Sequence, residues 1–410
     1  MEKIFYSDVR TGHHVSYNQL VDDIKHITSY CPYCKSGDYY EVFRHIVTSL
    51  LLGKEIILLD ADFTDAEVKK LVGDVNICDA ELVSIDVIVN EGNLIELLHN
   101  KTETWKITLF TSGTTGLPKQ VSHTFSSIAR QAKKSERHAE DVWGFAYNPT
   151  HMAGLQVFFQ ALVNQNSIIR LFGLDSKEII SEINKNKITH ISATPTFYRL
   201  LLPPMDICSS VTRLTSGGEK FDEHTLSQLT SLFPNAKLTN VYASTEAGTL
   251  FASKGNEFVI KEEMKDKVCV RDGELLIHKT LLAQSASIQF DGDWYHTGDL
   301  IEVSCEEPLT FRFISRKTEM INVGGYKVNP TEVEECLREC EGVKDAFVYA
   351  KANRIMGNLI MADVVRESGA VTEKSIREQL QIKLQEFKIP RIIKFVEYLN
   401  VTRTGKIART

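Results

Sequence analysis

The sequence predicts an α/β fold, in which a large N-terminal α/β domain of layered sheets and helices precedes a small, mobile α+β C-terminal domain. The chain of 410 residues is longer than one ordinary hydrophobic core organises, so two or more domains are expected. Amphipathic helix patterns alternate with short apolar runs, which is typical of layered α/β structure. Many of these runs end in Gly/Ser/Thr-rich loops, where open α/β sheets build their sites.

The first third of the chain carries two helix patterns, at residues 15–27 and 39–53, and two strand-like runs, at residues 55–60 and 86–90. The middle third continues in the same way. Its predicted strands fall at residues 167–172, 188–195, 211–221 and 236–248, and its predicted helices at 176–187 and 222–233.

After residue 303 the pattern changes to two strand-like runs around a charged turn. A helix then begins cleanly, because Asn329 can cap it, Pro330 fits its first position and Glu332 stands where a capping box needs it. Strands at 346–351, 358–365 and 392–399 and a helix at 372–387 complete a plausible small domain. We therefore expect domains at residues 1–315 and 319–410, joined by a hinge at 316–318.

Composition excludes several function classes. The chain is 43% hydrophobic and 25% charged, as in ordinary globular proteins. Its net charge of −7 argues against nucleic acid or an acidic membrane as partner. No apolar run reaches membrane-spanning length, and the first residues show no signal-peptide pattern, so we expect a cytoplasmic protein.

The eight cysteines do not form the dense framework of a disulfide scaffold. Cys31 and Cys34 have the CxxC spacing of a redox dithiol or of half a zinc site, but no second CxxC completes such a site. We expect reduced thiols without function. Cys336 and Cys340 share a helical stripe with neighbouring apolar residues, which predicts burial.

A loop rich in hydroxyls and glycines follows the strand-like run at residues 105–110. Residues 111–116 hold four hydroxyl side chains and two glycines, and Lys119 follows shortly after. We interpret the segment as strand, loop and helix, in which backbone N–H groups, hydroxyls and a lysine bind phosphate. It is not the Walker loop, because Leu117 and Pro118 separate Gly116 from Lys119. A plain Gly/Ser turn is the alternative.

Further segments carry groups suited to a nucleotide. Tyr242 offers a ring for a base, Glu246 a carboxylate for Mg²⁺, and Asp299 a carboxylate that can accept from both ribose hydroxyls. A lone arginine, Arg316, stands at the expected domain edge, and Lys406 lies on a Gly-containing loop near the end. Each residue alone also fits an ordinary surface or turn position.

In combination and in this order, these segments resemble the adenylate-forming superfamily of acyl-CoA and aryl-CoA synthetases, peptide-synthetase adenylation domains and luciferases. The resemblance covers essentially the whole chain. Its motifs here read "TSGTTGLPK", "HMAG", "YASTEAG", "YHTGDL", "INVGGYKVNPTEVEE" and "RTGKIAR".

The resemblance implies a two-step ligase that uses ATP, Mg²⁺ and CoA. A carboxylate first attacks the α-phosphate of ATP, which gives an acyl-adenylate and pyrophosphate, and a thiol then takes the acyl group and releases AMP. The small domain rotates between the steps, so that Lys406 serves the first step and the Gly324–Gly325 turn, as the thiol tunnel, serves the second.

The resemblance also implies roles for individual residues. Lys406 would bridge the carboxylate and the α-phosphate, Thr245 would contact the α-phosphate, and Glu246 would hold Mg²⁺. Nucleotide binding would fall to Thr111, Ser112, Gly113, Thr114, Thr115 and Lys119 for the β- and γ-phosphates, to Tyr242 for adenine, to Asp299 and Arg316 for the ribose, and to Gly218 and Glu219 nearby.

The acid is expected to lack an α-amino group. Peptide-synthetase domains hold that group with an aspartate, but residues 148–159 contain His151 and no acid, and a buried ammonium without a partner is costly. His151 would gate the acyl pocket as a catalytic and substrate-binding residue, or else be a hydrogen-bonded core histidine. Small apolar walls would suit an aromatic or medium aliphatic acid, and include Met152, Gly154, Ala193, Thr194, Gly217, Gly218 and Ala243.

Several alternatives remain open. The acceptor thiol is CoA or the pantetheine arm of a carrier protein, and the enzyme could be a CoA ligase of the o-succinylbenzoate type. Two other classes are a thiol-redox protein built on Cys31 and Cys34 and a catalytically dead nucleotide-binding module; retention of Lys119, Glu246 and Lys406 argues against the latter. The oligomeric state is open. Thr318 stands where the family usually has Asp or Lys, and the chain is short for the family before Thr111.

Overall fold

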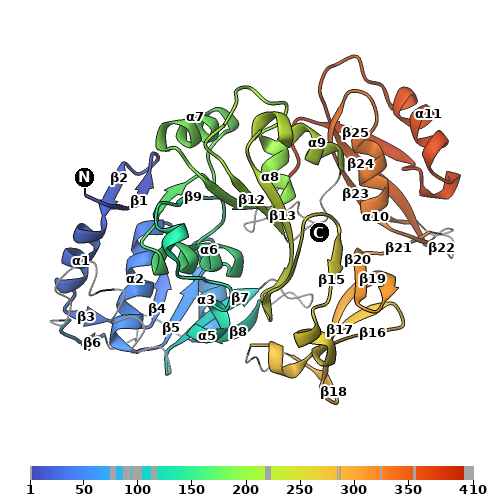
Figure 1. The fold of residues 1–410 in the computed structure, drawn as a ribbon. Coiled ribbons are helices and arrows are strands. Elements are labelled where there is room, and N and C mark those ends of the chain that lie inside the picture. Colours follow the sequence, from blue (N-terminus) through green and yellow to red (C-terminus); the bar gives the residue numbers. More distant parts are fainter. Residues whose placement is uncertain are drawn as a thin grey trace.

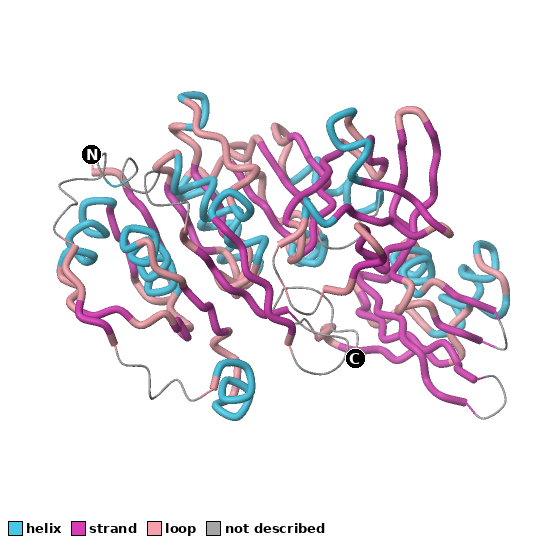
Figure 2. Tube along the Cα trace, turned by 90° about the horizontal axis from the view of Figure 1, so that it is seen from below, coloured by secondary structure: helices cyan, strands magenta, loops and turns pink. Residues whose placement is uncertain are grey.

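A computed structural model describes residues 2–73, 80–85, 94, 104–111, 118–217, 223–283, 285, 288–323, 326–353 and 357–400. Figure 1 shows the N-terminal elements on one side of the molecule and the C-terminal elements on the other. Figure 2 shows strands along the length of the molecule, with helices packed against them. The α/β fold class predicted from the sequence is confirmed.

A mixed sheet forms the centre of the N-terminal part. Its strands are parallel from β13 to β1, and the two edge strands β14 and β2 run antiparallel to their neighbours. In spatial order they are β14 (Gly248–Ser253), β13 (Lys237–Ser244), β12 (Arg213–Gly217), β11 (His190–Ala193), β9 (Val142–Phe145), β10 (Ser167–Arg170), β1 (Ile4–Asp8) and β2 (His13–Ser16).

The helices α6 (Met152–Val163), α7 (Ser176–Asn186), α8 (Pro195–Leu200) and α9 (Glu223–Leu232) connect strands of this sheet. They begin where the sequence supplies caps. Asp175 and Glu178 form a capping box at the start of α7, and Thr194 accepts from the Phe197 N–H at the start of α8. The strands and helices predicted for the middle third are confirmed.

A second sheet lies beside the first and contains β4 (Tyr33–Lys35), β5 (Ile56–Leu59), β7 (Lys106–Thr111) and β8 (Lys119–Thr124). Helices α1 (Tyr17–Lys25), α2 (Tyr39–Leu52) and α3 (Asp65–Val72) belong to the same part of the chain, as does the short pair β3 (Ser29–Tyr30) and β6 (Glu81–Leu82).

Helices α2 and α6 lie between the two sheets (Figure 1). Their facing rings fill this core: Phe43 and Phe158 stack with centroids 4.6 Å apart, and Phe5 of β1 packs edge-on against both. Both aromatic faces are removed from water, so this contact stabilises the pairing of the two sheets.

The segment after the phosphate loop is a strand, which corrects the expected order of strand, loop and helix. β8 pairs antiparallel with β7, so residues 112–118 connect a hairpin, and the helix α5 (Phe125–Ile128) is a single turn. The physical reason is alternation: Val121 and His123 are buried while the residues between them are not. In the described part of the chain, the segment that starts at Lys119 is therefore a strand and not the N-terminus of a helix.

A third, antiparallel sheet follows, with the strand order β15 (Glu257–Val259), β20 (Leu309–Arg316), β19 (Trp294–Glu306), β17 (Glu274–His278) and β16 (Val268–Arg271). β18 (Phe290–Asp291) pairs with β19, and short 3₁₀ turns lie at η3 (Glu262–Lys267) and η4 (Lys279–Leu281). Phe258 and Phe311 lie in its core, together with Tyr242 of the central sheet. This shared core joins the two sheets.

The last sheet contains β22 (Tyr326–Val328), β21 (Ile321–Val323), β24 (Gly357–Arg366), β23 (Val343–Asn353) and β25 (Ile392–Val396). Helices α10 (Pro330–Arg338) and α11 (Glu373–Lys383) and the turn η5 (Glu386–Lys388) accompany it, and its strands and helices share one apolar core. The boundary at 316–318 stays a prediction.

The predicted start of α10 is confirmed in part. The side chain of Asn329 accepts from the Thr331 N–H at 3.0 Å, and Pro330 occupies the first turn. The capping box is wrong, because the side chain of Glu332 accepts from Lys388 Nζ at 2.7 Å instead. An ammonium close to that carboxylate outcompetes a backbone N–H.

The described cysteines are free thiols. Cys34 is buried, and burial followed by the charge of Glu41 raises its pKa to about 12. A protonated thiol is a poor nucleophile and a poor metal ligand. Cys340 is buried, as predicted, and Cys336 is half-buried. Within the described ranges, no helix has the length and apolarity needed to span a bilayer.

Candidate active site

Three of the predicted nucleotide-binding residues lie together. Asp299 is 3% exposed, its Oδ2 accepts from the Tyr242 hydroxyl at 2.5 Å, and its Oδ1 accepts from Arg316 Nε at 3.0 Å. Asp299 and Arg316 face each other across the β19–β20 ladder, and Tyr242 comes from β13. Elements that are distant in sequence therefore position this carboxylate from two sides.

The Tyr242 hydroxyl stays protonated in this cluster. Burial, and then the charge of Asp299, raises the pKa of Tyr242 well above its ordinary value, so the hydroxyl keeps its proton and donates. A carboxylate has about four acceptor positions, and the binding of ribose hydroxyls by Asp299 stays a prediction. The Tyr242 ring packs against Phe251 at 5.6 Å, and its stacking on adenine stays a prediction.

His123, which the sequence pattern did not single out, lies on the strand that follows the predicted phosphate loop. Its ring is 1% exposed, and its Nε2 lies 2.8 Å from the backbone oxygen of Thr245. Its Nδ1 lies 2.9 Å from Ser127 Oγ. Because Lys119 begins the same strand, His123 holds β8 against the backbone of Thr245. The only sequence signal was its place in an alternating strand pattern.

Burial lowers the pKa of His123 from 6.5 to about 4. Between these values the unfolded chain binds more protons than the folded chain, so the free energy of unfolding falls as the pH drops from about 6.5 to 4. Across this window, the lowered pKa of His123 reduces the free energy of unfolding by a total of about 3 kcal/mol. Urea unfolding of wild type and His123→Gln across this window checks this. The variant should be less stable at pH 7 and show a shallower slope; parallel curves would contradict the assignment.

The carboxylate predicted to hold Mg²⁺ lies in the same region. Glu246 is half-buried, and its backbone oxygen accepts from the Ala283 N–H at 2.7 Å, which fixes the turn. Burial, followed by the negative charge of Glu246, raises the pKa of Tyr295 to about 12. Asp299 and Arg316 influence the same tyrosine, so these groups share one neighbourhood. A partly accessible carboxylate suits a hard cation such as Mg²⁺.

The region expected to bind the acid holds a carboxylate that the sequence analysis missed. Asp60, at the end of β5, lies with its Oδ2 3.0 Å from His151 Nε2, and it is 4% exposed. The amide of Asn148 approaches the same carboxylate at 3.4 and 3.5 Å. The sequence carried a signal for Asp60, because an acidic residue that directly follows a buried apolar strand lies at the edge of a sheet. His151 is thus a partnered, mostly buried histidine.

Several predicted pocket walls also have a packing role. A Cβ at Gly154 would lie 2.5 Å from the backbone oxygen of Asn148, and one at Gly217 would lie 2.6 Å from Val241 Cγ2. Met152 and Ala193 belong to the hydrophobic cores of the first sheet, while Ala243 is half-buried. Close packing alone accounts for both glycines, and a pocket-lining role for this set stays a prediction.

Gly154→Ala is expected to lower the free energy of unfolding by about 1–3 kcal/mol, because the new methyl group overlaps backbone rather than a movable side chain. The higher helix propensity of alanine offsets part of this loss. Chemical denaturation measures the change in the free energy of unfolding. Gly255→Ala is the matched control, since a Cβ there meets no atom within 4 Å. Equal stability of the two variants would contradict the packing argument.

Several predicted residues lie outside the described residues. They are Ser112, Gly113, Thr114, Thr115, Gly218, Glu219, Gly324, Gly325 and Lys406, and the side chain of Thr111 is likewise not described.

Comparison with family models gives two matches. The model for AMP-binding enzymes matches residues 50–270, and the model for the AMP-binding enzyme C-terminal domain matches residues 332–406. Together the two matches span most of the chain.

Curated relatives include two ligases. The chain is 26% identical to the 2-succinylbenzoate–CoA ligase of Enterococcus faecalis, over 90% of this chain and 85% of the relative. It is 25% identical to the putative long chain fatty acid–CoA ligase VraA of Staphylococcus epidermidis, over 73% of this chain and 69% of the relative.

Solved structures share the fold. ATP-bound MatB from Rhodopseudomonas palustris matches with a TM-score of 0.73 at 17% identity, covering 99% of this chain and 94% of that one. The o-succinylbenzoate CoA synthetase MenE from Bacillus subtilis, in complex with the acyl-adenylate OSB-AMP, matches with a TM-score of 0.72 at 19% identity, covering 100% and 94%.

Proposed function

The chain belongs to the AMP-binding enzymes, the adenylate-forming superfamily, and from that membership we propose an ATP-dependent ligase that joins a carboxylic acid without an α-amino group to CoA. The acid carboxylate attacks the α-phosphate of ATP and expels pyrophosphate. The CoA thiolate then attacks the acyl carbon of the acyl-adenylate and expels AMP. The reaction is that of an AMP-forming acyl- or aryl-CoA ligase and requires Mg²⁺.

The observation that carries the proposal is the cluster of Tyr242, Asp299 and Arg316 beside Glu246. It offers ribose acceptors and a metal-binding carboxylate in one neighbourhood. The His123 contact holds Thr245 against β8, the strand that begins at Lys119. The side chains of Thr245 and Lys119 would then stabilise the negative charge that develops on the α-phosphate. Enzymes of this kind gain most of their rate from such stabilisation.

The proposal that the acid lacks an α-amino group rests on how Asp60 is used. Its carboxylate lies beside His151 of the predicted acyl region, and it already accepts from His151 and Asn148. An incoming ammonium would have to displace these contacts from a buried group, which costs free energy. The names of the relatives, a 2-succinylbenzoate ligase and a fatty acid ligase, point to the same class of acid.

CoA is the proposed acceptor because these relatives are named as CoA ligases. A carrier-protein pantetheine arm remains the second candidate, and a cytoplasmic location remains part of the proposal.

Rotation of residues 319–410 about 316–318 would break the contact between Arg199 of α8 and Asp345 of β23, which lie 3.4 Å apart (Nε to Oδ2). That ion pair would therefore favour the arrangement seen here.

The test is one incubation series. The enzyme is supplied with Mg-ATP, CoA and a panel of aromatic, aliphatic and α-amino acids, among them 2-succinylbenzoate, and both AMP and thioester are measured by mass spectrometry. We expect thioester from an acid without an α-amino group. CoA as the acceptor would be rejected if AMP forms without a CoA thioester, and if thioester forms only when a pantetheine-loaded carrier protein replaces CoA.

A further inference from the structure

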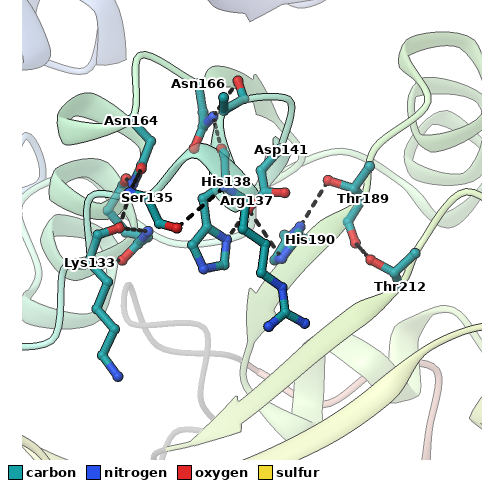
Figure 3. Close-up of polar contacts among 12 residues, drawn as sticks. Lys133, Ser135, Arg137, His138, Asp141, Asn164, Asn166, Thr189, His190 and Thr212 are labelled. Carbon is teal, nitrogen blue, oxygen red and sulfur yellow. Dashed lines mark hydrogen bonds and ion pairs between the residues drawn. The ribbon is translucent and has the colours of Figure 1, made fainter.

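A cluster of two histidines and one aspartate lies at the amino-terminal edge of the central sheet. His138 ends the short turn η2 (Glu136–His138), Asp141 directly precedes β9, and His190 begins β11. The loops of the candidate active site follow the carboxyl ends of the strands, so the cluster lies at the opposite edge. Figure 3 shows the two rings with Asp141 beside them.

The three side chains present ligand atoms to one point. Asp141 Oδ2 lies 2.7 Å from His138 Nδ1 and 3.4 Å from His190 Nε2. Among the residues that the structure describes, one ligand atom from each of these three lies within 4.8 Å of the others. In a tetrahedral zinc site, bond lengths near 2.1 Å place ligand atoms about 3.3 Å apart. The His190–Asp141 separation already fits, and the His138–Asp141 pair needs to open slightly.

The ring of His190 is oriented by its neighbours. Its Nδ1 lies 2.9 Å from Thr189 Oγ1, which also accepts from the Val142 N–H at 2.9 Å and donates to Val142 O at 3.2 Å. When that hydroxyl donates to Val142 O, it accepts from Nδ1–H, and Nε2 turns a lone pair toward the Asp141 carboxylate. A cation bound between His190 Nε2 and the Asp141 carboxylate would accept a lone pair from each. Contacts that orient a ring, such as the one from Thr189, are typical of metal-bound histidines.

The segment that carries His138 is also held rigidly. Asn166 is 0% exposed and donates from Nδ2 to His138 O at 2.7 Å and to Ala139 O at 3.3 Å. Asn164 accepts from the Ser135 N–H at 3.0 Å, so two buried amides fix the turn before β9 (Figure 3). A site whose ligands are held in advance loses little entropy when an ion binds.

We propose that His138, Asp141 and His190 bind one divalent transition metal ion, with Zn²⁺ as the best fit. Imidazole nitrogens favour zinc over Mg²⁺ or Ca²⁺, and three protein ligands leave the fourth position to water. The ion would tie the turn before β9 to β11, and it would therefore stabilise the fold rather than take part in the ligase reaction. The charge of Arg213, the ladder partner of His190, opposes a cation and should keep the affinity below that of closed zinc sites.

The test is independent of ligase activity. Full-length protein is stripped with EDTA, freed of chelator and titrated with ZnCl₂ by calorimetry at neutral pH. We expect about one more equivalent bound by wild type than by His190→Gln or Asp141→Asn, and zinc should raise the Tm of wild type by roughly 2 °C or more. His13→Gln is the matched control, because His13 lies 3.6 Å from Asp38 but belongs to no group of three possible metal ligands among the described residues.

A second measurement does not depend on how the histidine variants fold. The Trp143 and His190 rings lie with centroids 4.9 Å apart, so Ni²⁺ at the cluster should quench Trp143 fluorescence. Trp143→Phe should keep nickel binding and lose most of the quenching. The proposal is overturned if wild type binds no more zinc than His190→Gln, if His13→Gln loses the same equivalent, or if the quenching survives in Trp143→Phe.

Discussion

Lys406→Ala is expected to slow acyl-adenylate formation by about 10²–10³-fold while leaving transfer of a supplied acyl-adenylate to the thiol nearly unchanged. The ammonium of Lys406 would stand between the attacking carboxylate and the α-phosphate, where negative charge gathers. In the second step the adenylate is already made and the small domain would have rotated, so Lys406 would have no charge to neutralise.

Single-turnover assays of each half-reaction measure the effect of Lys406→Ala. Lys374→Ala is the matched control, because this lysine lies in the same C-terminal part, its side chain is 86% exposed and its ion-pair partner is Glu378. An exposed pair of that kind contributes little. Equal loss in both half-reactions would mean that Lys406 acts structurally or that the small domain does not rotate.

Asp299→Ala is expected to lower kcat/KM for ATP by about 10²-fold, mainly through a higher KM. The variant removes an ionised acceptor for ribose hydroxyls, and hydrogen bonds to charged groups contribute about 1.5–3 kcal/mol each. It also leaves the Tyr242 hydroxyl and Arg316 Nε without their carboxylate partner. The free energy of unfolding should therefore fall by about 1–3 kcal/mol.

Initial rates at varied ATP and varied acid separate these contributions. Glu302→Ala is the control, because Glu302 pairs with Arg312 at 2.6 Å in the same β19–β20 ladder but is 53% exposed. Its kinetics should match wild type. An increase in KM for the acid rather than for ATP would place Asp299 in the acid-binding subsite and contradict its assignment to nucleotide binding.

Elements with strong local signals could be predicted from the sequence. The Asn329 cap with Pro330 starts α10, and the apolar periodicity of residues 39–53 gives α2. The phosphate loop at residues 111–116 stays a prediction, and the segment after it was expected to be helical. In β8 the buried side chains of Val121 and His123 alternate with less buried neighbours, and the strand pairs with β7. This strand pairing overrides the helix prediction, and it is tertiary information that local propensity does not contain.

The contacts that complete the site join distant segments. His151 and Asp60 are 91 residues apart, and His123 and Thr245 are 122 residues apart. Composition and spacing within a motif carry no information on such pairs. The pattern of residues 148–159 therefore contains no sign of Asp60, the buried acid after β5 that the fold brings to His151.

The central claim is that this chain uses ATP to activate a carboxylic acid without an α-amino group. The most direct test is acid-dependent exchange of labelled pyrophosphate into ATP in the presence of Mg²⁺, across the acid panel and without any thiol. We expect exchange that depends on Mg²⁺ and on an aromatic or medium aliphatic acid. Exchange stimulated only by α-amino acids would contradict the role given to Asp60, and no exchange with any acid would contradict acid activation itself.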